Sequence, residues 1–498
     1  MRDLAGWIER HAIFTPDKIA IEHAGGALSY RALAGRIAQL AEWLTTVQGL
    51  SRGSRVAWLG LNAPDLIALL FACAHTELIC VPLNWRLTTA ELEDVLRDAG
   101  ASLLIVDASC HAAGSALDHP RRVVTGSADG DRDGRVPPDR GGYTLNARQI
   151  AADTPVLLVY TSGTTGSPKG ALMSQGAVLF NALNAVHMHD MTAADRVLTV
   201  LPMFHVGGLN IQTIPALYCG ASVYVAARFE AAPTLHLIET WRPTLTTLVP
   251  AMISALAAQP IWPRADLTAL RAVATGSTDV PLASIAALHE RKVPVIQIYG
   301  STETGPVTIY QRRQEAYTTA GAIGRAGLHS DVRLVDAEGR DVADDVPGQI
   351  LVRGPHVASG YWSAAIERVV PWADGWFASG DVAVRDVSGL YWFKDRIKHV
   401  IISGGENIYP AELERILGSS ALVHEAAIAA RADLRWGQVP VVVAVKSRPE
   451  VSAGDILALF EGRLARYKQP RAVIFVDALP RTALGKVETA RLHELLGQ

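Results

Sequence analysis

Residues 155–170 read PVLLVYTSGTTGSPKG, an apolar run that passes directly into a loop of Gly, Ser and Thr. The run from Pro155 to Tyr160 predicts a strand that is buried on both faces. In the loop, glycines let the backbone approach a ligand, hydroxyls can donate hydrogen bonds and Lys169 adds a positive charge, which together suit a polyphosphate. The loop is not of the Walker A type, because Pro168 precedes the lysine and Gly170 follows it where Ser or Thr is required. The stretch therefore predicts a phosphate-binding loop after a buried strand.

Similar apolar runs recur on both sides of this stretch. They lack the alternation of half-exposed strands, and helical patterns separate them, which predicts an α/β fold whose large N-terminal body holds stacked, mostly parallel sheets. Residues 108–154 are rich in Gly, Asp, Arg and Pro and predict an excursion on the surface. The other predicted strands are Arg55 to Gly60, Ser102 to Asp107, Leu245 to Val249, Ala272 to Thr275 and Val293 to Tyr299.

The last hundred residues predict a separate, small α+β domain. Ser452 followed by Asp455 resembles a capping box and marks the start of its second helix. We expect an N-terminal domain at residues 1–394, a hinge at 395–398 and a C-terminal domain at 399–498. The predicted order of elements is a strand at 399–402, a glycine loop, a helix at 411–417, strands at 425–430 and 439–446, a helix, and a strand at 471–476.

Composition excludes several classes of protein. The 498 residues are 49% hydrophobic and 19% charged, which excludes a disordered chain. Lys plus Arg (46) nearly balances Asp plus Glu (49), so no global charge attracts nucleic acid. The longest apolar run, Leu66 to Ala74, is too short to span a membrane, and the first residues lack a secretory signal. The four cysteines show no disulfide or zinc spacing, so we expect a cytoplasmic protein.

The loop at 160–170 resembles the phosphate-binding signature of the acyl-adenylate-forming (ANL) superfamily. Further segments resemble the superfamily's other motifs in the same order, so the resemblance covers nearly the whole chain. It implies a large body that binds ATP and the acyl group, followed by a small mobile lid domain. The segments are PMFHVGG at 202–208, YGSTETG at 299–305, SGD at 379–381, KDRIK at 394–398, SGGENIYP at 403–410 and PRTALGK at 480–486.

The resemblance implies an AMP-forming acyl-CoA synthetase that uses ATP, Mg²⁺ and coenzyme A. Bacterial fatty-acyl-CoA synthetases look most similar, so we expect a medium- or long-chain fatty acid. The alternatives are an aryl-CoA ligase of the benzoate or cinnamate type and an adenylating enzyme that loads a separate carrier protein. No carrier domain follows Lys486, which favours a free-standing ligase. A nucleotide sensor without turnover is a further alternative, and a monomer and a homodimer both remain open.

The resemblance places the nucleotide on the phosphate loop and on several strand ends. Glu303 is the implied Mg²⁺ ligand, Tyr299 faces adenine, and Asp381 accepts from the ribose hydroxyls with Arg396 beside it. From residue chemistry alone, Asp381 and Arg396 equally suit a structural ion pair. Ser277 departs from the family's usual adenine-lining run. The full set is Thr161, Ser162, Gly163, Thr164, Thr165, Gly166, Lys169, Ser277, Gln297, Tyr299, Gly300, Thr302, Asp381 and Arg396.

The remaining assignments concern catalysis, the acid and coenzyme A. The implied catalytic residues are Lys486, His205, Thr302 and Glu303. We expect His205 to position the acid and not to transfer a proton, because an ionised carboxylate needs no base to attack ATP. Lys398 is the implied pivot of the lid. The acyl pocket is assigned to His205, Gly207, Gly208, Leu209, Thr275, Gly276 and Gly300, and coenzyme A to Gly404, Gly405, Glu406, Lys468 and Arg471.

Overall fold

The computed structural model describes residues 1–125, 144–161, 169–276, 280–366, 368–403, 406–434, 436–464, 466–481 and 487–496. Contacts divide the chain into two compact units. The N-terminal unit comprises Met1–Val280, Ser284–Val332 and Val352–Phe377. The C-terminal unit comprises Pro281–Ala283, Arg333–Leu351 and Ala378–Gln498. The hinge expected at 395–398 falls within the C-terminal unit, and it stays a prediction.

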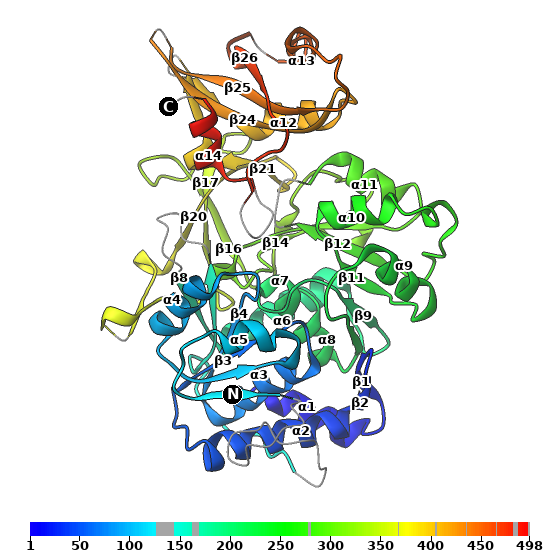
Figure 1. The fold of residues 1–498 in the computed structure, drawn as a ribbon, viewed down its shortest axis with the longest axis vertical. Helices are drawn as coiled ribbons and strands as arrows, with labels where there is room; N and C mark the ends of the chain where they lie inside the picture. The colour runs from blue at the N-terminus through cyan, green and yellow to red at the C-terminus, as the bar shows by residue number, and fades with distance from the viewer. Residues whose placement is uncertain are drawn as a thin grey trace. The chain divides into compact units, whose positions relative to one another are not determined.

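The strand before the phosphate loop, β7, lies in the first large sheet of the N-terminal unit, of which Figure 1 labels β3, β4 and β8. The strands β7, β4, β3, β5 and β6 run parallel, while β8, β18 and β19 pair in antiparallel fashion at one edge. Buried runs such as RVAWL and SLLIV form its centre, as the sequence predicts. In spatial order the strands are β19 (Arg368–Val370), β18 (Gly360–Ser363), β8 (Lys169–Ser174), β7 (Pro155–Thr161), β4 (Ile79–Leu83), β3 (Arg55–Leu59), β5 (Ala101–Val106) and β6 (Arg122–Val124).

The second large sheet carries the other predicted strand ends. Six of its described strands, β13 through β1 in spatial order, are parallel, and β2, β14 and β15 are antiparallel. The mostly parallel α/β body is therefore confirmed. The order is β15 (Arg325–Ala326), β14 (Ile309–Tyr310), β13 (Val295–Tyr299), β12 (Ala272–Gly276), β11 (Leu245–Thr247), β9 (Arg196–Thr199), β10 (Ser222–Val225), β1 (Ile19–His23) and β2 (Gly26–Ser29).

Helices cover both faces of these sheets. The main core cluster joins residues of both sheets with residues of α1, α2, α3, α6, α7 and α8, so these helices fill the space between the sheets. Helices α9, α10 and α11 cover the outer face of the second sheet, as Figure 1 shows in green, and α4 covers the first. The bounds are α1 (Ala5–Phe14), α2 (Tyr30–Glu42), α3 (Pro64–Thr76), α4 (Thr89–Ala99), α5 (His111–Ser115), α6 (Gln175–His189), α7 (Val206–Asn210), α8 (Thr213–Cys219), α9 (Ala231–Thr240), α10 (Pro250–Ala257) and α11 (Leu282–His289).

The C-terminal unit contains two smaller sheets. One has the order β16 (Asp331–Val335), β17 (Gly348–Arg353), β20 (Phe377–Arg385) and β21 (Tyr391–Arg396). The other has the order β23 (Glu406–Ile408), β22 (Ile401–Ser403), β25 (Gly437–Lys446) and β24 (Val423–Asp433), with β26 (Ala472–Phe475) parallel to β25. Helices α12 (Pro410–Gly418) and α13 (Ala453–Ala458) share a core with the second sheet, and α14 (Thr489–Leu495) follows. The small α+β domain is confirmed.

Local signals in the C-terminal unit are mostly confirmed, with one error. The capping box at α13 is present, because Ser452 Oγ accepts from the Asp455 amide and Asp455 Oδ2 accepts from the Ser452 amide. The strand predicted at 399–402 was wrong at its start. Residues Ile397–His399 form a 3₁₀ turn (η8), and β22 begins at Ile401. The turn is closed by a 3.3 Å hydrogen bond from the Val400 amide to the Ile397 carbonyl.

The structure also bears on the apolar run at 66–74 and on the surface excursion predicted at 108–154. The apolar run Leu66–Ala74 is the buried centre of α3. None of the helices in the described residues combines the length and the apolar character that crossing a bilayer requires. The predicted surface excursion at 108–154 includes α5 and β6, which extends the first sheet, and its residues 126–143 lie outside the described part of the chain.

Candidate active site

The phosphate loop joins β7 to β8 as the connection of an antiparallel hairpin. Thr161 and Lys169 are paired at its base, and Thr161 Oγ1 donates to the Lys169 carbonyl at 3.3 Å. The ammonium of Lys169 lies 5.4 Å from the centre of the Tyr361 ring on β18, a cation–π distance. The assigned residues Ser162, Gly163, Thr164, Thr165 and Gly166 lie outside the described residues. The hairpin thus brings Lys169 close to β18.

The chain after β13 makes a tight turn that carries Glu303. The 3₁₀ turn η4 (Thr302–Thr304) is capped by Ser301, whose amide donates to Thr304 Oγ1 at 2.9 Å. A Cβ atom on Gly300 would lie 1.8 Å from the Pro306 carbonyl oxygen, so only glycine fits there. Thr302 and Glu303 are buried, with Glu303 8% exposed. The turn holds both predicted catalytic side chains of this segment on rigid backbone.

Tyr361 fixes the Glu303 carboxylate. Its hydroxyl donates to Glu303 Oε1 at 2.5 Å, and the Ala358 amide donates to the Glu303 carbonyl at 2.8 Å. Burial, and then the charge of Glu303, raises the pKa of Tyr361, so the phenol stays protonated and remains a donor. The sequence did not indicate Tyr361, since it lies 58 residues from Glu303.

The residues present fit a magnesium ion that is shared with ATP. Within the described residues, no cluster of three or more His, Cys, Asp or Glu side chains could hold a metal alone. Mg²⁺, however, is commonly bound by one or two carboxylates together with substrate phosphates. Glu303 supplies one such buried carboxylate, and Tyr361 is bonded to only one of its oxygens among the contacts described.

Three buried asparagines hold the segment that follows Glu303. Asn181 of α6 accepts from the Val307 amide at 3.0 Å, and Asn184 of α6 donates to the Val307 carbonyl at 3.0 Å. The side-chain amide of Asn210, at the end of α7, donates to the Gly305 carbonyl at 3.0 Å. The backbone carbonyl of Asn210 accepts from the side-chain amide of Asn181 at 2.7 Å. Helices α6 and α7 therefore fix both sides of this turn through side-chain amides, a network that sequence reasoning missed.

His205 and the glycines after it open helix α7. His205 is the N-cap, and its Nδ1 accepts from the Gly207 amide at 3.0 Å, which leaves the proton of a neutral ring on Nε2. A Cβ on Gly208 would lie 2.3 Å from the Pro202 carbonyl oxygen, so the tight entry to α7 requires glycine. Leu209 is fully buried in the main core.

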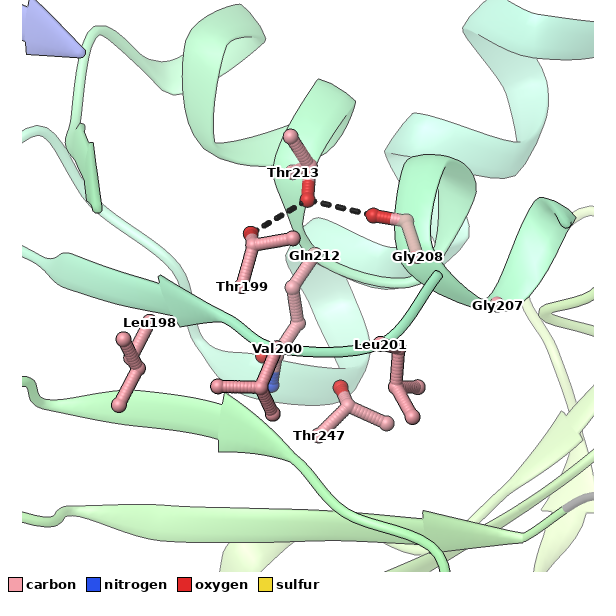
Figure 2. Close-up of a pocket in the computed structure, with 9 residues that line it drawn as sticks. All are labelled: Leu198, Thr199, Val200, Leu201, Gly207, Gly208, Gln212, Thr213 and Thr247. Atoms are coloured by element: carbon pink, nitrogen blue, oxygen red, sulfur yellow. Dashed lines mark hydrogen bonds between the residues drawn. The ribbon is translucent and has the colours of Figure 1, made fainter. Parts of the chain in front are cut away.

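A small pocket lies beside α7, between the ends of β9 and β11 and the start of α8 (Figure 2). Thr213 Oγ1 lies 2.6 Å from the Gly208 carbonyl oxygen and 2.6 Å from Thr199 Oγ1. Of the predicted acyl-pocket residues, Gly207 and Gly208 line it, while Thr275, Gly276 and Gly300 lie at or just beyond the ends of the neighbouring strands β12 and β13. The lining residues are Leu198, Thr199, Val200, Leu201, Gly207, Gly208, Gln212, Thr213 and Thr247.

Sequence reasoning did not single out four of the residues that line this cavity of about 10 Å³, namely Thr199, Gln212, Thr213 and Thr247. A signal for Thr247 was present, because it ends β11 and ligands of parallel α/β sheets bind beyond the carboxyl ends of the strands. Thr213 and Gln212 carried no such signal. They reach the pocket only because α8 packs beside α7.

The residues assigned to adenine are only partly described. Tyr299 is half-buried at the end of β13. Gln297, on the same strand, is 4% exposed, and its side-chain oxygen accepts from the Gly321 amide at 2.7 Å. Ser277 lies outside the described residues. The structure therefore gives Gln297 a hydrogen bond within the protein, and its role toward ATP stays a prediction.

In the C-terminal unit, Asp381 and Arg396 lie directly opposite each other on β20 and β21. Arg396 Nε is 3.2 Å from Asp381 Oδ1, so the ion pair considered from the sequence is present. The Asp381 residue is 8% exposed, whereas Arg396 is exposed. Lys398 lies on η8, and burial, followed by the charge of Arg396, lowers the pKa of its ammonium. The ribose and pivot roles of these residues stay predictions.

The residues assigned to coenzyme A do not form one described cluster. Lys468 makes an ion pair with Glu412 of α12, with Nζ 2.8 and 3.0 Å from the two carboxylate oxygens. Arg471 is exposed just before β26, and Glu406 is exposed at the start of β23. Gly404, Gly405 and the implied catalytic Lys486 lie outside the described residues.

Comparison with known proteins places the chain among characterised families. A family model described as "AMP-binding enzyme" matches residues 8–362, and one described as "AMP-binding enzyme C-terminal domain" matches residues 412–486. The chain is 45% identical over 503 residues to the indoleacetate–CoA ligase of Aromatoleum aromaticum, covering 100% of this chain and 98% of that protein. It is 37% identical over 497 residues to a feruloyl-CoA synthase of Amycolatopsis sp, covering 99% of each.

Solved structures agree with these matches. The o-succinylbenzoate CoA synthetase of Bacillus subtilis, solved with its acyl-adenylate intermediate, gives a TM-score of 0.84 at 28% identity, covering 98% of this chain and 97% of that chain. The same enzyme solved with ATP and a magnesium ion gives a TM-score of 0.83 at 28% identity, covering 99% of each chain.

Proposed function

The chain belongs to the AMP-binding enzyme family, and we propose that it joins an aromatic carboxylic acid to coenzyme A. It is an AMP-forming acid–thiol ligase of the ANL superfamily. Its substrates are a carboxylic acid, ATP and coenzyme A, and it uses Mg²⁺. The acid's carboxylate attacks the α-phosphorus of ATP to give acyl-AMP and pyrophosphate, and the thiol of coenzyme A then displaces AMP.

The sequence favoured a fatty acid and kept an aryl acid as the alternative. The relatives support the alternative better. The observation that carries the proposal is the 45% identity, over the full length of the chain, to a protein named indoleacetate–CoA ligase. The second relative is named for feruloyl-CoA, which also contains an aromatic acid.

The N-terminal unit contributes several of the groups that we assign to the first half-reaction. Mg²⁺ held by the Glu303 carboxylate and by the phosphates of ATP would neutralise charge as two anions approach each other. Tyr361 keeps that carboxylate in place through its hydroxyl. Lys169, at the base of the hairpin, adds a positive charge for the phosphates, and Thr302 is the hydroxyl donor next to Glu303.

His205 orients the acid and does not transfer a proton. Because Nδ1 is occupied by the Gly207 amide, the ring can offer an Nε2 proton as a hydrogen-bond donor. A donor beside the acid orients a carboxylate without removing a proton from it. Asp381 with Arg396 binds the ribose, Lys486 serves adenylation, and Gly404 and Gly405 line the path of the thiol. Lys398 is the pivot between the two half-reactions.

A panel of carboxylic acids tests the substrate class. AMP release in the presence of coenzyme A is measured with aryl acetates, cinnamates, benzoates and fatty acids of increasing chain length. We expect the largest kcat/KM with an aryl acid, and at least tenfold less with every fatty acid. If a fatty acid gave the largest kcat/KM, the aryl proposal would be overturned and the expectation of a fatty acid from the sequence would be restored. If the enzyme transferred the acyl group to a carrier protein and released no acyl-CoA, its assignment as a CoA ligase would be wrong.

A further inference from the structure

The strands next to the phosphate loop carry different side chains on their two faces. Successive side chains of a strand point to opposite faces. Lys169 and Tyr361 meet on the face of Glu303, because the Lys169 ammonium is 5.4 Å from the centre of the Tyr361 ring, whose hydroxyl donates to Glu303. On the other face, Tyr160 of β7 and Trp362, the residue after Tyr361, pack against the core cluster that contains α4. The second pair can therefore fix the backbone that carries the first.

One residue of α4, Asp98, accepts hydrogen bonds from both aromatic side chains. The Tyr160 hydroxyl donates to Asp98 Oδ2 at 2.6 Å, and Trp362 Nε1 donates to the Asp98 backbone carbonyl at 2.8 Å. Burial, and then the hydrogen bond to Asp98, raises the pKa of Tyr160, so the phenol stays protonated and remains a donor. In Figure 1, α4 lies next to β8, and the two share the core cluster. Asp98 thus links the end of β7, directly before the phosphate loop, to β18.

The end of α4 is itself held by the centre of the first sheet. The last carbonyls of an α-helix have no partners within the helix. Trp362 donates to the carbonyl of Asp98, and Arg55 Nε donates to that of Ala99 at 2.7 Å. The Arg55 guanidinium also lies 5.2 Å from the centre of the Trp362 ring. Because Arg55 opens the central strand β3, the position of Asp98 is fixed independently of the phosphate hairpin.

Tyr160 passes this position on to the residue beside Lys169. Tyr160 is paired with Gly170 of β8. A Cβ atom on Gly170 would lie 3.0 Å from Tyr160 Cζ and 2.8 Å from Leu158 Cδ1, so the tyrosine ring fills the space over this glycine. A displaced Tyr160 ring would therefore free the backbone next to Lys169 to move.

We propose that Asp98 is a positioning residue for ATP, which fixes Tyr160 and through it the place of Lys169. Asp98 acts through the hairpin and not by contact with the reacting atoms. The inference rests on the phosphate-binding role proposed above for Lys169, and it adds the group that holds this lysine at the correct distance from Tyr361 and Glu303.

Asp98→Ala and Tyr160→Phe test the inference, since each removes the same hydrogen bond. KM for Mg·ATP is measured by pyrophosphate exchange at saturating acid, and the second half-reaction by thioester formation from supplied acyl-AMP. We expect KM for Mg·ATP to rise by ~10-fold in each variant, because displaced binding groups lose affinity steeply. KM for the acid and the thioester step should stay within threefold of the parent. The double variant should be no worse than either single one, because both changes break one interaction.

Two further variants separate positioning from a general loss of stability. Asp98→Asn keeps an oxygen that accepts from Tyr160, so it should return KM for Mg·ATP to within threefold of the parent. Tyr30→Phe is the matched control, because the fully buried Tyr30 of α2 donates its hydroxyl to the Ala221 carbonyl at 2.7 Å. It should leave KM for Mg·ATP unchanged. A smaller folded fraction lowers both half-reactions together and does not change KM.

Lys169→Ala distinguishes the inference from the role beneath it. This variant should raise KM for Mg·ATP at least as much as Asp98→Ala, and a calorimetric Kd for Mg·ATP gives the same comparison for any variant that is too slow to assay. If Asp98→Ala does not fold, Tyr160→Phe alone decides. An unchanged KM in Tyr160→Phe, or an equal rise in Tyr30→Phe, overturns the inference and leaves the role of Lys169 intact. An unchanged affinity in Lys169→Ala overturns that role and the inference together.

Discussion

The two units of the chain differ in how far their candidate functional residues are buried and held by neighbouring side chains. In the N-terminal unit, Glu303 and Thr302 are buried, and asparagines and Tyr361 fix their turn. In the C-terminal unit Asp381 is buried as well, but Arg396 and Lys398 are exposed. Charges that are fixed in a dry site act on a substrate without reorganisation, whereas exposed charges are weakened by water. The difference indicates that the charged groups of the N-terminal unit are preorganised. The exposed charges of the C-terminal unit interact strongly with a substrate only once water is excluded from around them.

The sharpest test of this comparison is Lys486→Ala. If the C-terminal unit brings this lysine to the acid and the α-phosphate, its loss should slow acyl-AMP formation by ~100- to 1000-fold, or about 3 to 4 kcal/mol. The thioester step from supplied acyl-AMP should remain within a few-fold of the parent. Pyrophosphate exchange measures the first half-reaction and thioester release the second. Equal loss in both halves would remove Lys486 from the adenylation step.

Lys398→Pro tests whether the domain predicted at residues 399–498 must move. Proline fixes φ near −65° and restricts the residue before it, so it hinders rotation at this position without removing a contact to ATP. We expect acyl-AMP formation to survive within a few-fold and acyl-CoA formation to fall by roughly 100-fold, since one domain would have to present different loops in each step. Lys398→Ala, which removes the same side chain but leaves the backbone free to rotate, is the control for loss of the lysine. Thioester formation at the parental rate would place the pivot elsewhere.

Mild acid should lower the folding stability of the N-terminal unit. Burial lowers the pKa of His189 and of His356 to about 4, and both lie in that unit. In the unfolded chain a histidine titrates near 6.5. Between these pH values the unfolded state therefore binds more protons than the folded state. The stability contributed by each neutral histidine is complete above pH 6.5 and is lost as the pH falls toward 4. At pH 5.5 the loss is about 1.4 kcal/mol for each histidine.

Calorimetry at pH 7.5 and 5.5 measures this loss. The transition of the N-terminal unit should move to lower temperature at pH 5.5, and His356→Gln should remove about as much of that pH dependence as His189 contributes, since burial lowers both pKa values to about 4. Burial also lowers the pKa values of His187 and His289, which add to the same dependence. If the C-terminal unit lost stability first in this range, the assignment of the acid-sensitive groups to the N-terminal unit would be wrong.

The sequence was informative where signals are local. Continuous apolar runs predicted the parallel strands, and the Ser452–Asp455 pair predicted the start of α13, because burial and capping depend on near neighbours. The strand predicted at 399–402 began two residues too early. One hydrogen bond closes Ile397–His399 into a 3₁₀ turn, and β22 begins at Ile401. Family motifs indicated Glu303 and His205. Nothing in the sequence linked Tyr361 to Glu303, or Asn181 to Val307, since these contacts form only when distant segments pack together.

Tyr361→Phe measures how much the preorganisation of the N-terminal unit contributes. The change removes only the hydroxyl that donates to Glu303 Oε1. Partners that hold a metal-binding side chain typically contribute 10- to 100-fold to metal affinity. We therefore expect the Mg²⁺ concentration for half-maximal activity to rise by about tenfold, or ~1.4 kcal/mol, with kcat at saturating Mg²⁺ within about threefold. Tyr310→Phe is the matched control, because that buried tyrosine instead bonds His187 Nδ1 at 2.9 Å. A Mg²⁺ dependence unchanged in Tyr361→Phe, or changed equally in Tyr310→Phe, would mean that Glu303 needs no support from β18. The two units would then differ in burial alone, and the N-terminal unit could not be called the preorganised partner.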